Sequence, residues 1–297
     1  MSRKLSAIGE FGLIGLIKRA APKTSGVVLG IGDDAAVIAK NNREYWLLTA
    51  DMLVEGVHFT RAMGARRIGR KSLACNISDI AAMGGVPRYA LVSLGLRPDD
   101  SVKFATDLCQ GITRLARKYG IAVIGGDTVR SRKTTISISL MGEVEKKNLL
   151  TRRGARTGDK IFVTGRLGRS LASGKHLTFT PRVKEARQLV KFKPSAMIDI
   201  SDGLAADLGH ILKESKKGAV LYADKVPLST GAALTNALHD GEDFELLFTL
   251  PASRVRALAR SKQRFYCVGE ITGKRECLEL IGKKGKKRIA GKGYRHF

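Results

Sequence analysis

The sequence predicts a protein of two consecutive α/β domains, and three observations carry this prediction. The chain has 297 residues, enough for one large or two medium domains with buried cores. Glycine is abundant, at 33 residues, and only 6% of residues are aromatic, which favours many strand-to-helix turns over a β-sandwich or a helical bundle. Short apolar strand patterns alternate with helical patterns, and a composition change near the middle separates two such series.

The first series begins with short β-type runs and continues with two helices. Residues 66–83 form a helical pattern that stops at Gly84-Gly85, with Pro87 just beyond, which is typical of a helix end. A second helix is predicted over 100–119, because Phe104, Leu108, Ile112, Leu115 and Tyr119 recur at helical spacing. Strands are expected at 27–31, 37–39, 45–49, 89–96, 121–124 and 134–144.

The second series follows a stretch rich in Lys, Arg, Gly and Asn over 145–158, which we take as the boundary between domains 1–147 and 148–297. A glycine turn over 165–168 follows its first strand. Its strands are expected at 160–164, 196–200, 246–250, 265–271 and 277–289, and its helices at 182–191, 203–215 and 252–261.

The charge of the chain is unusual. Lys and Arg total 53 against 27 Asp and Glu, a net charge of +26. This fits either a nucleic-acid binder or an enzyme for anionic substrates. The basic residues are spread out, and the densest run, 283–288, is predicted to be a solvated hairpin tip. Because no RNA-binding aromatic signature, helix-turn-helix pattern or Cys/His finger accompanies the charge, it does not decide the function.

Targeting and cysteine patterns indicate a cytoplasmic protein. The apolar stretch Phe11 to Ile17 is too short to span a bilayer and lacks the layout of a signal peptide. No CxxC pair is present, so the four cysteines are expected to be buried small hydrophobes in a reducing compartment: Cys75, Cys109, Cys267 and Cys277.

The residues that carry chemistry are aspartates at predicted strand ends and turns, where α/β folds place their binding groups. They are Asp33, Asp34, Asp51, Asp79, Asp127, Asp199 and Asp202. A single Asp in such a turn is usually a turn former or helix cap, and Asp33 fits that description.

The apolar surroundings of two of these aspartates indicate a role other than capping. Asp79 lies among apolar helix residues, and Asp199 interrupts an apolar strand. Two carboxylates about 4 Å apart repel by roughly 4 kcal/mol at an effective dielectric near 20. Crowded aspartates therefore either take up protons or bind cations. Oxygen ligands without His or Cys select Mg²⁺ or Mn²⁺ over zinc, and Mg²⁺ held by carboxylates and phosphate oxygens is typical of kinases.

No familiar ATP signature is present. The chain has neither a GxxxxGK[ST] loop nor a protein-kinase HRD or DFG set. Gly125-Gly126 and the turn at 165–168 could bring bare backbone amides to an anion, although tight turns need glycine for structural reasons as well.

Short motifs spread in order over nearly the whole chain resemble those of the thiamine-monophosphate kinases. They are GEF at 9–11, GIGDDA at 30–35, TAD at 49–51, GVHF at 56–59, KSLACNISDIAAMG at 71–84, GGDT at 125–128, LTR at 150–152, GD at 158–159, DISDGL at 199–204, GEDFEL at 241–246 and the closing HF at 296–297. So many short motifs in register are far more specific than any one of them.

The resemblance implies the two-domain α/β fold of the aminoimidazole-ribonucleotide synthetase superfamily, with an N-terminal domain that dimerises. It implies direct transfer of the γ-phosphoryl group of ATP to thiamine monophosphate, with several Mg²⁺ ions and no phosphoenzyme. The expected partners are thus thiamine monophosphate, ATP and a second copy of the chain, with no membrane and no requirement for nucleic acid.

The resemblance also assigns roles by motif. The metal shell would consist of Asp34, Thr49, Ala50 through its backbone, Asp51, Asp79, Asp127, Asp199 and Asp202. Catalysis would fall to Asp51, Asp127 and Arg152, and ATP contacts to Gly126, Asp127, Arg152 and Ser201. The thiamine phosphate would be faced by His58, Glu242 and the residue at position 291. Without the resemblance, His58 between Val57 and Phe59 fits a core or rim histidine.

The chain departs from the pattern in two places. The family's substrate-packing aromatic near the C-terminus is matched here by Gly291, so Tyr294 is a candidate replacement. The segment after Gly168 also differs from the family's turn and is shorter.

Two alternatives stay open on the sequence. One is another member of the superfamily, such as the purine cyclo-ligase, although GEDFEL and the HF ending argue against it. The other is a non-catalytic RNA-binding protein, suggested by the charge alone.

Overall fold

The structure, a computed structural model, describes residues 4–22, 24–283, 285–291 and 293–294. Its first half is built on a six-stranded sheet with the order β1-β2-β3-β6-β4-β5. Neighbouring strands are antiparallel, except that β4 and β5 are parallel. The strands are β1 (Val27–Leu29), β2 (Ala36–Ala39), β3 (Glu44–Val54), β4 (Val86–Leu96), β5 (Ala122–Arg130) and β6 (Thr135–Glu145).

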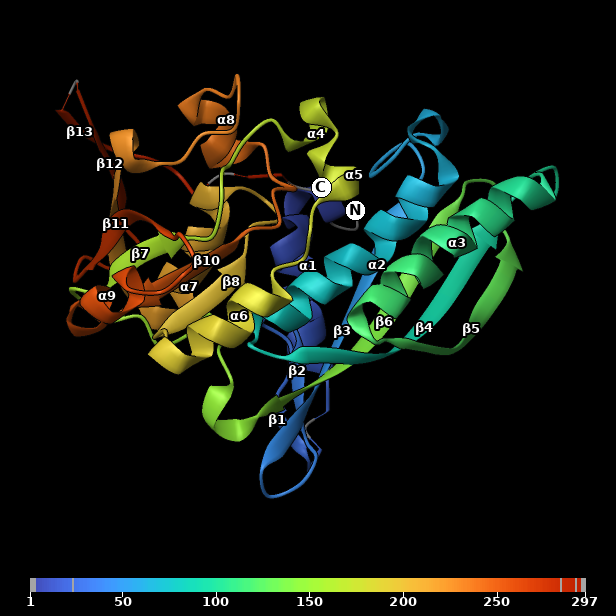
Figure 1. Cartoon of the computed structure of the whole chain (residues 1–297), viewed down its shortest axis with the longest axis horizontal. Coiled ribbons are helices and arrows are strands. Elements are labelled where there is room, and N and C mark those ends of the chain that lie inside the picture. Colours follow the sequence, from blue (N-terminus) through green and yellow to red (C-terminus); the bar gives the residue numbers. More distant parts are fainter. Residues whose placement is uncertain (1–3, 23, 284, 292, 295–297) are drawn as a thin grey trace.

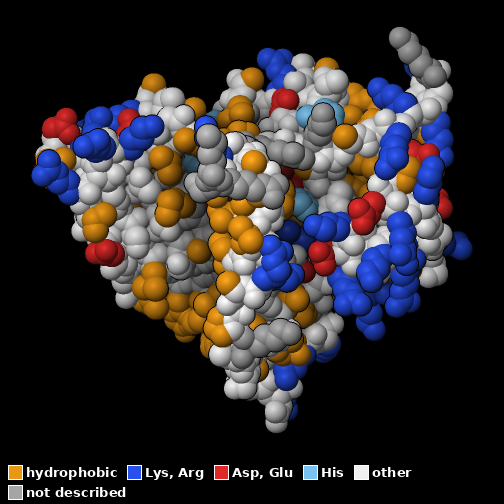
Figure 2. Space-filling model, turned by 180° about the vertical axis from the view of Figure 1, so that it is seen from behind, with side chains coloured by type: hydrophobic (Ala, Val, Ile, Leu, Met, Phe, Trp, Pro, Cys, Tyr) orange, Lys and Arg blue, Asp and Glu red, His pale blue; other side chains and the backbone are white. Residues whose placement is uncertain are grey.

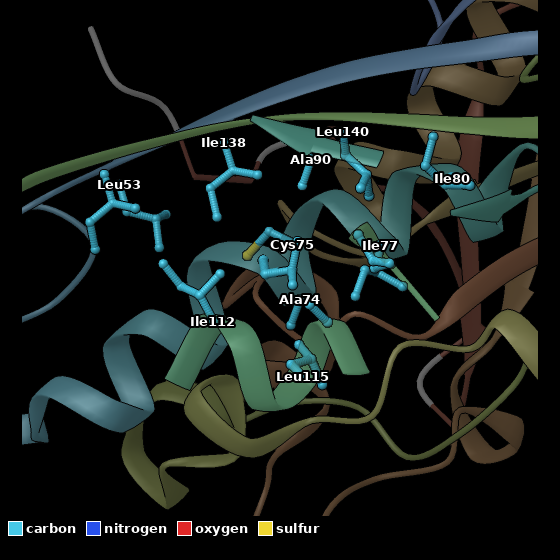
Figure 3. Packing of buried hydrophobic residues seen from close by; sticks show 14 of the residues in the cluster. Leu53, Ala74, Cys75, Ile77, Ile80, Ala90, Ile112, Leu115, Ile138 and Leu140 are labelled. Atoms are coloured by element: carbon cyan, nitrogen blue, oxygen red, sulfur yellow. The ribbon is translucent and has the colours of Figure 1, made fainter. Parts of the chain in front are cut away.

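Two long helices, α2 (Ala65–Ala82) and α3 (Val102–Tyr119), lie on one face of this sheet (Figure 1). The Ser101 hydroxyl caps α3 by accepting from the Phe104 amide at 3.1 Å, and Gly120 ends it with a φ of 65°. The apolar stripe of α3 packs on α2, and α2 packs on the sheet, so the core forms between them (Figure 3). Helix α2 is therefore buried along most of its length.

The two helices touch backbone to backbone where they cross. A Cβ on Gly69 would lie 2.0 Å from the carbonyl oxygen of Leu108, and one on Gly111 would lie 2.1 Å from that of Arg66. Both positions require glycine, because any side chain would push the helices apart.

On the opposite face of the sheet, many of the described apolar side chains are exposed. Side chains alternate along β3, so Leu53 is buried while Met52 is 57% exposed. Leu91 on β4 and Val129 on β5 are exposed as well, and all nine residues of the edge strand β5 are exposed. Figure 2 looks onto this open face, where hydrophobic side chains are spread over a shallow hollow.

The second half contains a seven-stranded sheet with the order β13-β12-β9-β11-β7-β10-β8. Its strands are β7 (Lys160–Val163), β8 (Ala196–Asp199), β9 (Gly218–Tyr222), β10 (Leu246–Leu250), β11 (Tyr266–Thr272), β12 (Leu278–Gly282) and β13 (Gly285–Arg288). The remaining α-helices are α1 (Gly9–Ala20), α4 (Ser170–Ser173), α5 (Lys175–Thr178), α6 (Val183–Leu189), α7 (Leu204–Ser215), α8 (Leu234–His239) and α9 (Ala252–Ala259). Short 3₁₀ turns occur at Leu5–Ala7, Arg61–Met63, Lys146–Asn148, Val190–Phe192 and Ala223–Lys225.

Helix α2 joins the two halves. It packs against β3, β4 and β6 on one side and against α5, α6 and β8 of the second half on the other. Helix α1 lies against α7, where the rings of Phe11 and His210 are 4.9 Å apart. No helix among the described residues is long and apolar enough to cross a membrane.

Most predicted elements lie close to their expected bounds. A hairpin does form from β12 and β13, but most of the basic run is the exposed strand β13 itself and not the tip. Strand β5 is the main correction, because it continues from Ala122 through the GGDT motif to Arg130 instead of ending at residue 124. Strand β3 likewise runs past Asp51 to Val54. Partner strands continue alongside in both cases, and their pairing carries each strand through its polar residues.

Some elements were not predicted. The sequence analysis missed α1, α4, α5, α8 and β9. The expectation for the cysteines holds only in part. All four are free, but Cys109 on α3 is exposed and Cys267 is only half-buried. Cys109 lies on the solvent side of an amphipathic helix, where no packing requires an apolar residue.

Candidate active site

Three of the predicted aspartates meet between the two halves of the molecule. Asp34 lies in the loop between β1 and β2, Asp79 on α2 and Asp199 at the end of β8. Each offers a carboxylate oxygen, and these oxygens all lie within 4.8 Å of one another. The loop, the helix and the strand come from distant parts of the chain, so the group exists only in the folded protein.

Hydroxyl and guanidinium donors hold the three carboxylates in place. Thr49 Oγ1 donates to Asp79 Oδ2 at 2.6 Å, and Ser78 Oγ donates to Asp199 Oδ2 at 2.6 Å. Arg152 Nη2 donates to Asp34 Oδ1, also at 2.6 Å. Asp34 Oδ2 is buried without a hydrogen-bond partner. A buried carboxylate oxygen with a free lone pair beside two other carboxylates fits a cation, the ligand such an atom would otherwise lack.

The pKa values show how crowded these groups are. Burial raises the pKa of Asp199 to about 8, with the Asp34 charge as the next cause. Burial also raises the pKa of Asp79 well above its ordinary value, and the charges of Asp51, Asp199 and Asp34 add to the effect. A bound divalent cation would relieve both the burial cost and the repulsion.

Asp51 belongs to the same electrostatic neighbourhood. It lies inside β3, where its backbone amide donates to Asn76 Oδ1 of α2 at 3.2 Å. Burial, followed by the charge of Asp34, raises its pKa to about 6. Thr49, two residues earlier, uses its hydroxyl on Asp79, and Ala50 between them is exposed.

Arg152 and Asp33 fix the loop that carries Asp34. Asp33 accepts the Arg152 backbone amide at 3.1 and 3.2 Å and the Asp34 amide at 3.1 Å, as expected of a turn-forming aspartate. Burial, then the Asp34 charge, raises the Asp33 pKa to about 7. For Arg152, burial opposes the charge, but the charges of Asp34, Asp33 and Asp199 outweigh it and raise its pKa.

A cavity of about 340 Å³ adjoins the carboxylates. It brings together predicted metal, ATP and substrate residues, and its walls include Ala50, Asp51, His58, Asp79, Ser201, Asp202, Glu242 and Tyr294. Ser201 and Asp202 lie in the turn between β8 and α7. A polar cavity beside a carboxylate cluster suits a small charged substrate.

His58 and Glu242 approach this cavity from opposite halves. His58 follows β3, and its Nδ1 accepts the Val54 amide at 3.0 Å, so the imidazole is held by its own loop. Glu242 lies in the loop before β10, with a φ of 53°. Burial opposes its charge, but contacts with His176 and Lys71 outweigh burial and lower its pKa.

Gly126 and Asp127 are not brought into this group. Asp127 pairs across the sheet with Ser93, Ser93 with Ser137, and Ser137 with Met52. Three strand spacings, about 14 Å, therefore separate Asp127 from β3. It also shares the open face with Met52, whereas Thr49 contacts Asp79 of α2 on the helix side. The Gly125-Gly126 amides lie within β5, and no turn forms there.

Two further predicted groups have other surroundings than expected. The second glycine turn does form after β7, but the Gly168 amide donates to Asp243 Oδ2 at 2.8 Å, so a carboxylate of the chain takes the place expected for an anion. Gly291 lies outside the 340 Å³ cavity, on the wall of a neighbouring cavity of about 720 Å³. Tyr294 lines both cavities, which keeps it as the candidate aromatic.

A second carboxylate group forms at the start of α7. Asp202, Asp207 and His210 offer atoms within 4.8 Å of one another. Asp207 Oδ2 accepts the backbone amides of Asp202 and Gly203, each at 3.1 Å, so it closes the turn that follows Asp199. Burial lowers the pKa of His210 to about 4, with the Arg152 charge as the next cause.

The sequence analysis missed several polar residues of the site. Asn76 and Ser78 stand inside the quoted α2 motif but received no role, although they hold Asp51 and Asp199. Lys71 is 0% exposed and contacts Glu242. A lysine within an otherwise apolar helix face was the available signal. His176 lies in the segment that departs from the family pattern, where no comparable signal existed.

Comparison with known proteins identifies the class. The model of the AIR synthase related protein N-terminal domain matches residues 32–144, and that of the C-terminal domain matches residues 156–289. The two-domain α/β fold expected from the sequence, that of AIR synthase related proteins, is thereby confirmed.

Full-length relatives narrow the class to one family. The chain is 35% identical to the thiamine-monophosphate kinase of Buchnera aphidicola subsp. Schizaphis graminum, over 97% of this chain and 98% of that protein. It is also 35% identical to the Aquifex aeolicus enzyme, over 99% and 100%. A solved structure described as AaThiL complexed with AMPPCP and TMP superposes with a TM-score of 0.89 at 33% identity, covering 100% of both chains. The chain belongs to the thiamine-monophosphate kinase family.

Proposed function

We propose that this protein transfers the γ-phosphoryl group of ATP to the phosphate of thiamine monophosphate, yielding thiamine diphosphate and ADP. The observation that carries the proposal is the carboxylate group of Asp34, Asp79 and Asp199 at the edge of a cavity that also contains His58 and Glu242. Family membership supports it, since a structural relative is described as binding both an ATP analogue and TMP.

In this reaction a phosphate oxygen of thiamine monophosphate forms the new bond to the γ-phosphorus, and the bond from that phosphorus to the β–γ bridging oxygen breaks. Such a transfer depends on alignment and on neutralised charge more than on a strong base. Several Mg²⁺ ions bound by the aspartates would neutralise the phosphates of both substrates. Asp34, Asp79 and Asp199 are the proposed inner group, with Thr49, the Ala50 carbonyl, Asp51 and Asp202 completing it.

The remaining residues bind and orient the substrates. Arg152 supplies a cation that stays charged beside Asp34, and its guanidinium would donate hydrogen bonds to a γ-phosphate placed there. Ser201 offers a hydroxyl to ATP from the turn after β8. His58 and Glu242 contact the thiamine moiety, and Tyr294 supplies the aromatic surface absent at Gly291.

The working unit is a homodimer joined through the open face of the first sheet. An exposed edge strand and an uncovered apolar sheet face are liabilities in a monomer, and β5 has both. Gly126 and Asp127, too distant from the carboxylates of their own chain, would serve ATP and metal from the partner subunit. The N-terminal part, 1–147, then carries the dimer contact and 148–297 the second half of the site, in a cytoplasmic enzyme.

A coupled assay tests the function. Purified protein with ATP, Mg²⁺ and thiamine monophosphate should release ADP and thiamine diphosphate in equal amounts. The purine cyclo-ligase precursor, offered under the same conditions, should give no ADP above background. Turnover of that precursor, or no ADP with thiamine monophosphate, would contradict the proposal.

A further inference from the structure

We propose that Lys71 is a positioning residue for thiamine monophosphate: its buried ammonium fixes His58 and Glu242, on opposite sides of the cavity, in one relative arrangement. The inference rests on the proposed function and adds to it residues that received no role above, Lys71 and its neighbour His176.

The contacts of Lys71 account for all three protons of its ammonium group. Lys71 Nζ donates to the His58 carbonyl oxygen at 3.0 Å and to Glu242 Oε1 at 2.5 Å, and lies 3.1 Å from His176 Nδ1. His58 belongs to the first half, whereas Glu242 and His176 belong to the second. One side chain thus links the two walls of the cavity.

Lys71 and His176 are buried, so the contacts of the Lys71 ammonium cannot be replaced by water. Lys71 is 0% exposed and His176 is 1% exposed. A fully buried ammonium costs several kcal/mol unless it is paired, and a partner left behind after its removal bears the same kind of cost. Among the described residues, Glu242 is the carboxylate that pairs with Lys71, so each of the two charges depends on the other.

The backbone of Glu242 is fixed independently of this pair. Its amide donates to the Ser201 carbonyl at 2.7 Å, and its carbonyl accepts from Ser170 Oγ at 2.6 Å. A non-glycine residue at a φ of 53° costs on the order of 1 kcal/mol and persists only where the surroundings enforce it. The loop therefore presents Glu242 in one place, and Lys71 selects the direction of its side chain.

His176 lies beside both members of this pair. Its Nδ1 is 3.1 Å from Lys71 Nζ and 3.1 Å from Glu242 Oε2. This nitrogen can accept from Lys71 or donate to Glu242, depending on its tautomer, but cannot do both at once. Lys71 and His176 thus approach the two oxygens of Glu242 separately, and together they restrict the orientation of its carboxylate.

The test compares Lys71→Met, which keeps an unbranched side chain one atom shorter and removes the charge, with wild type. We expect the KM for thiamine monophosphate to rise at least about 10-fold, with the KM for ATP unchanged, because the lost contacts lie on the thiamine side of the cavity. Without its ammonium partner Glu242 holds protons more tightly. The acidic limb of kcat/KM for thiamine monophosphate should therefore move to higher pH, a shift that general loosening of the fold would not produce.

A matched control is Lys175→Met. Lys175 precedes His176 and pairs with Asp243 at 3.5 Å and Glu245 at 3.3 Å, but has no contact with His58 or Glu242. Its KM values and pH profile should match wild type. A Lys71→Met enzyme with wild-type KM, or with both KM values raised together, would overturn the inference.

If Lys71→Met does not fold, the double variant Lys71→Met/Glu242→Gln removes both charges and leaves none unpaired. Its KM for thiamine monophosphate should equal that of Glu242→Gln, because Lys71 acts through Glu242; a wild-type KM would refute the positioning role. Wild-type protein that fails to phosphorylate thiamine monophosphate would contradict the proposed function instead, so the two failures are distinguishable.

Discussion

At the scale of single residues, the site concentrates negative charge that the protein alone does not balance. Arg152 is the cation hydrogen-bonded to Asp34, while Asp79 and Asp199 receive hydroxyl donors, which orient a carboxylate without neutralising it. Burial, together with this unbalanced charge, raises the pKa values of Asp79 and Asp199. Charge concentrated in this way is costly for the folded chain and useful for binding cations.

The change Asp79→Asn separates the cost of this charge to stability from its contribution to cation binding. Asn keeps the shape of the side chain and removes one of the repelling charges, so the metal-free protein should unfold at the same temperature as wild type or higher. Turnover should fall about 100-fold or more, because a metal ligand would be lost. Calorimetry and the coupled assay measure the two quantities.

Asp99→Asn is the control for this prediction, because Asp99 is a surface carboxylate with a 79% exposed side chain. Asp99→Asn should leave the unfolding temperature and the turnover unchanged. Full activity of Asp79→Asn would remove Asp79 from the metal shell.

The sequence predicted the aspartates but not the residues that orient them. Asp34, Asp79 and Asp199 carry a signal of their own, since a carboxylate in an apolar setting demands a partner. The role of Lys71 depends on contacts with residues 105 and 171 positions away along the chain. No local pattern records such a contact, and only the folded chain reveals it.

At the scale of secondary-structure elements, strong periodicity made the long helices predictable. Helix α3 has one apolar face, a Ser cap and a terminal Gly, and its bounds match the expectation within two residues. Helix α1 was missed because it has no buried residue and its polar and apolar positions do not separate clearly. Strand β5 extends beyond its predicted end because it pairs with β4 over its whole length. This pairing cannot be recognised from the residues of β5 alone.

Strand β5 provides the prediction at this scale. Val129→Lys places a charge on the open face, where Val129 is 54% exposed, and should convert a dimer to a monomer because a buried lysine without a partner is costly. Analytical ultracentrifugation at micromolar concentration measures the change. Val102→Lys adds the same charge at an 84% exposed position on α3 and should remain dimeric. A monomeric wild type, or a dimeric Val129→Lys, would rule out this interface.

At the scale of the whole molecule, the basic charge is distributed unevenly. Figure 2 shows Lys and Arg side chains gathered toward the two ends of the molecule, with fewer over the hollow between them. The proposed dimer contact would thus keep the densest basic groups of this face away from the partner, which reduces the repulsion that a net charge of +26 produces.

The buried aspartates also make stability depend on pH. The pKa values of Asp199, Asp33 and Asp51, about 8, 7 and 6, lie above those of the unfolded chain, near 4. The folded state holds more protons between these limits, so their contribution to stability decreases as pH rises from about 4 to 8. Mg²⁺ competes with those protons and binds more tightly when they are gone.

We therefore expect Mg²⁺ to raise the unfolding temperature more at pH 8 than at pH 6. Differential scanning fluorimetry over a series of Mg²⁺ concentrations measures the shift at each pH. In Asp79→Asn, most of this Mg²⁺-dependent rise in unfolding temperature should be lost. An equal shift at both pH values would show that Mg²⁺ does not bind in competition with these protons.

Helix α2 restricts how the two halves can move. It carries Lys71, which reaches Glu242, and Ser78, which reaches Asp199. Seven residues at about 1.5 Å of rise place these two contacts roughly 10 Å apart along the helix axis. Arg70 of the same helix also donates to the Leu177 carbonyl at 3.2 Å, and α5, α6 and β8 pack along the helix. Contacts spread along the rod in this way leave no single hinge point, so any opening of the cavity must first break a buried ion pair or a buried hydrogen bond.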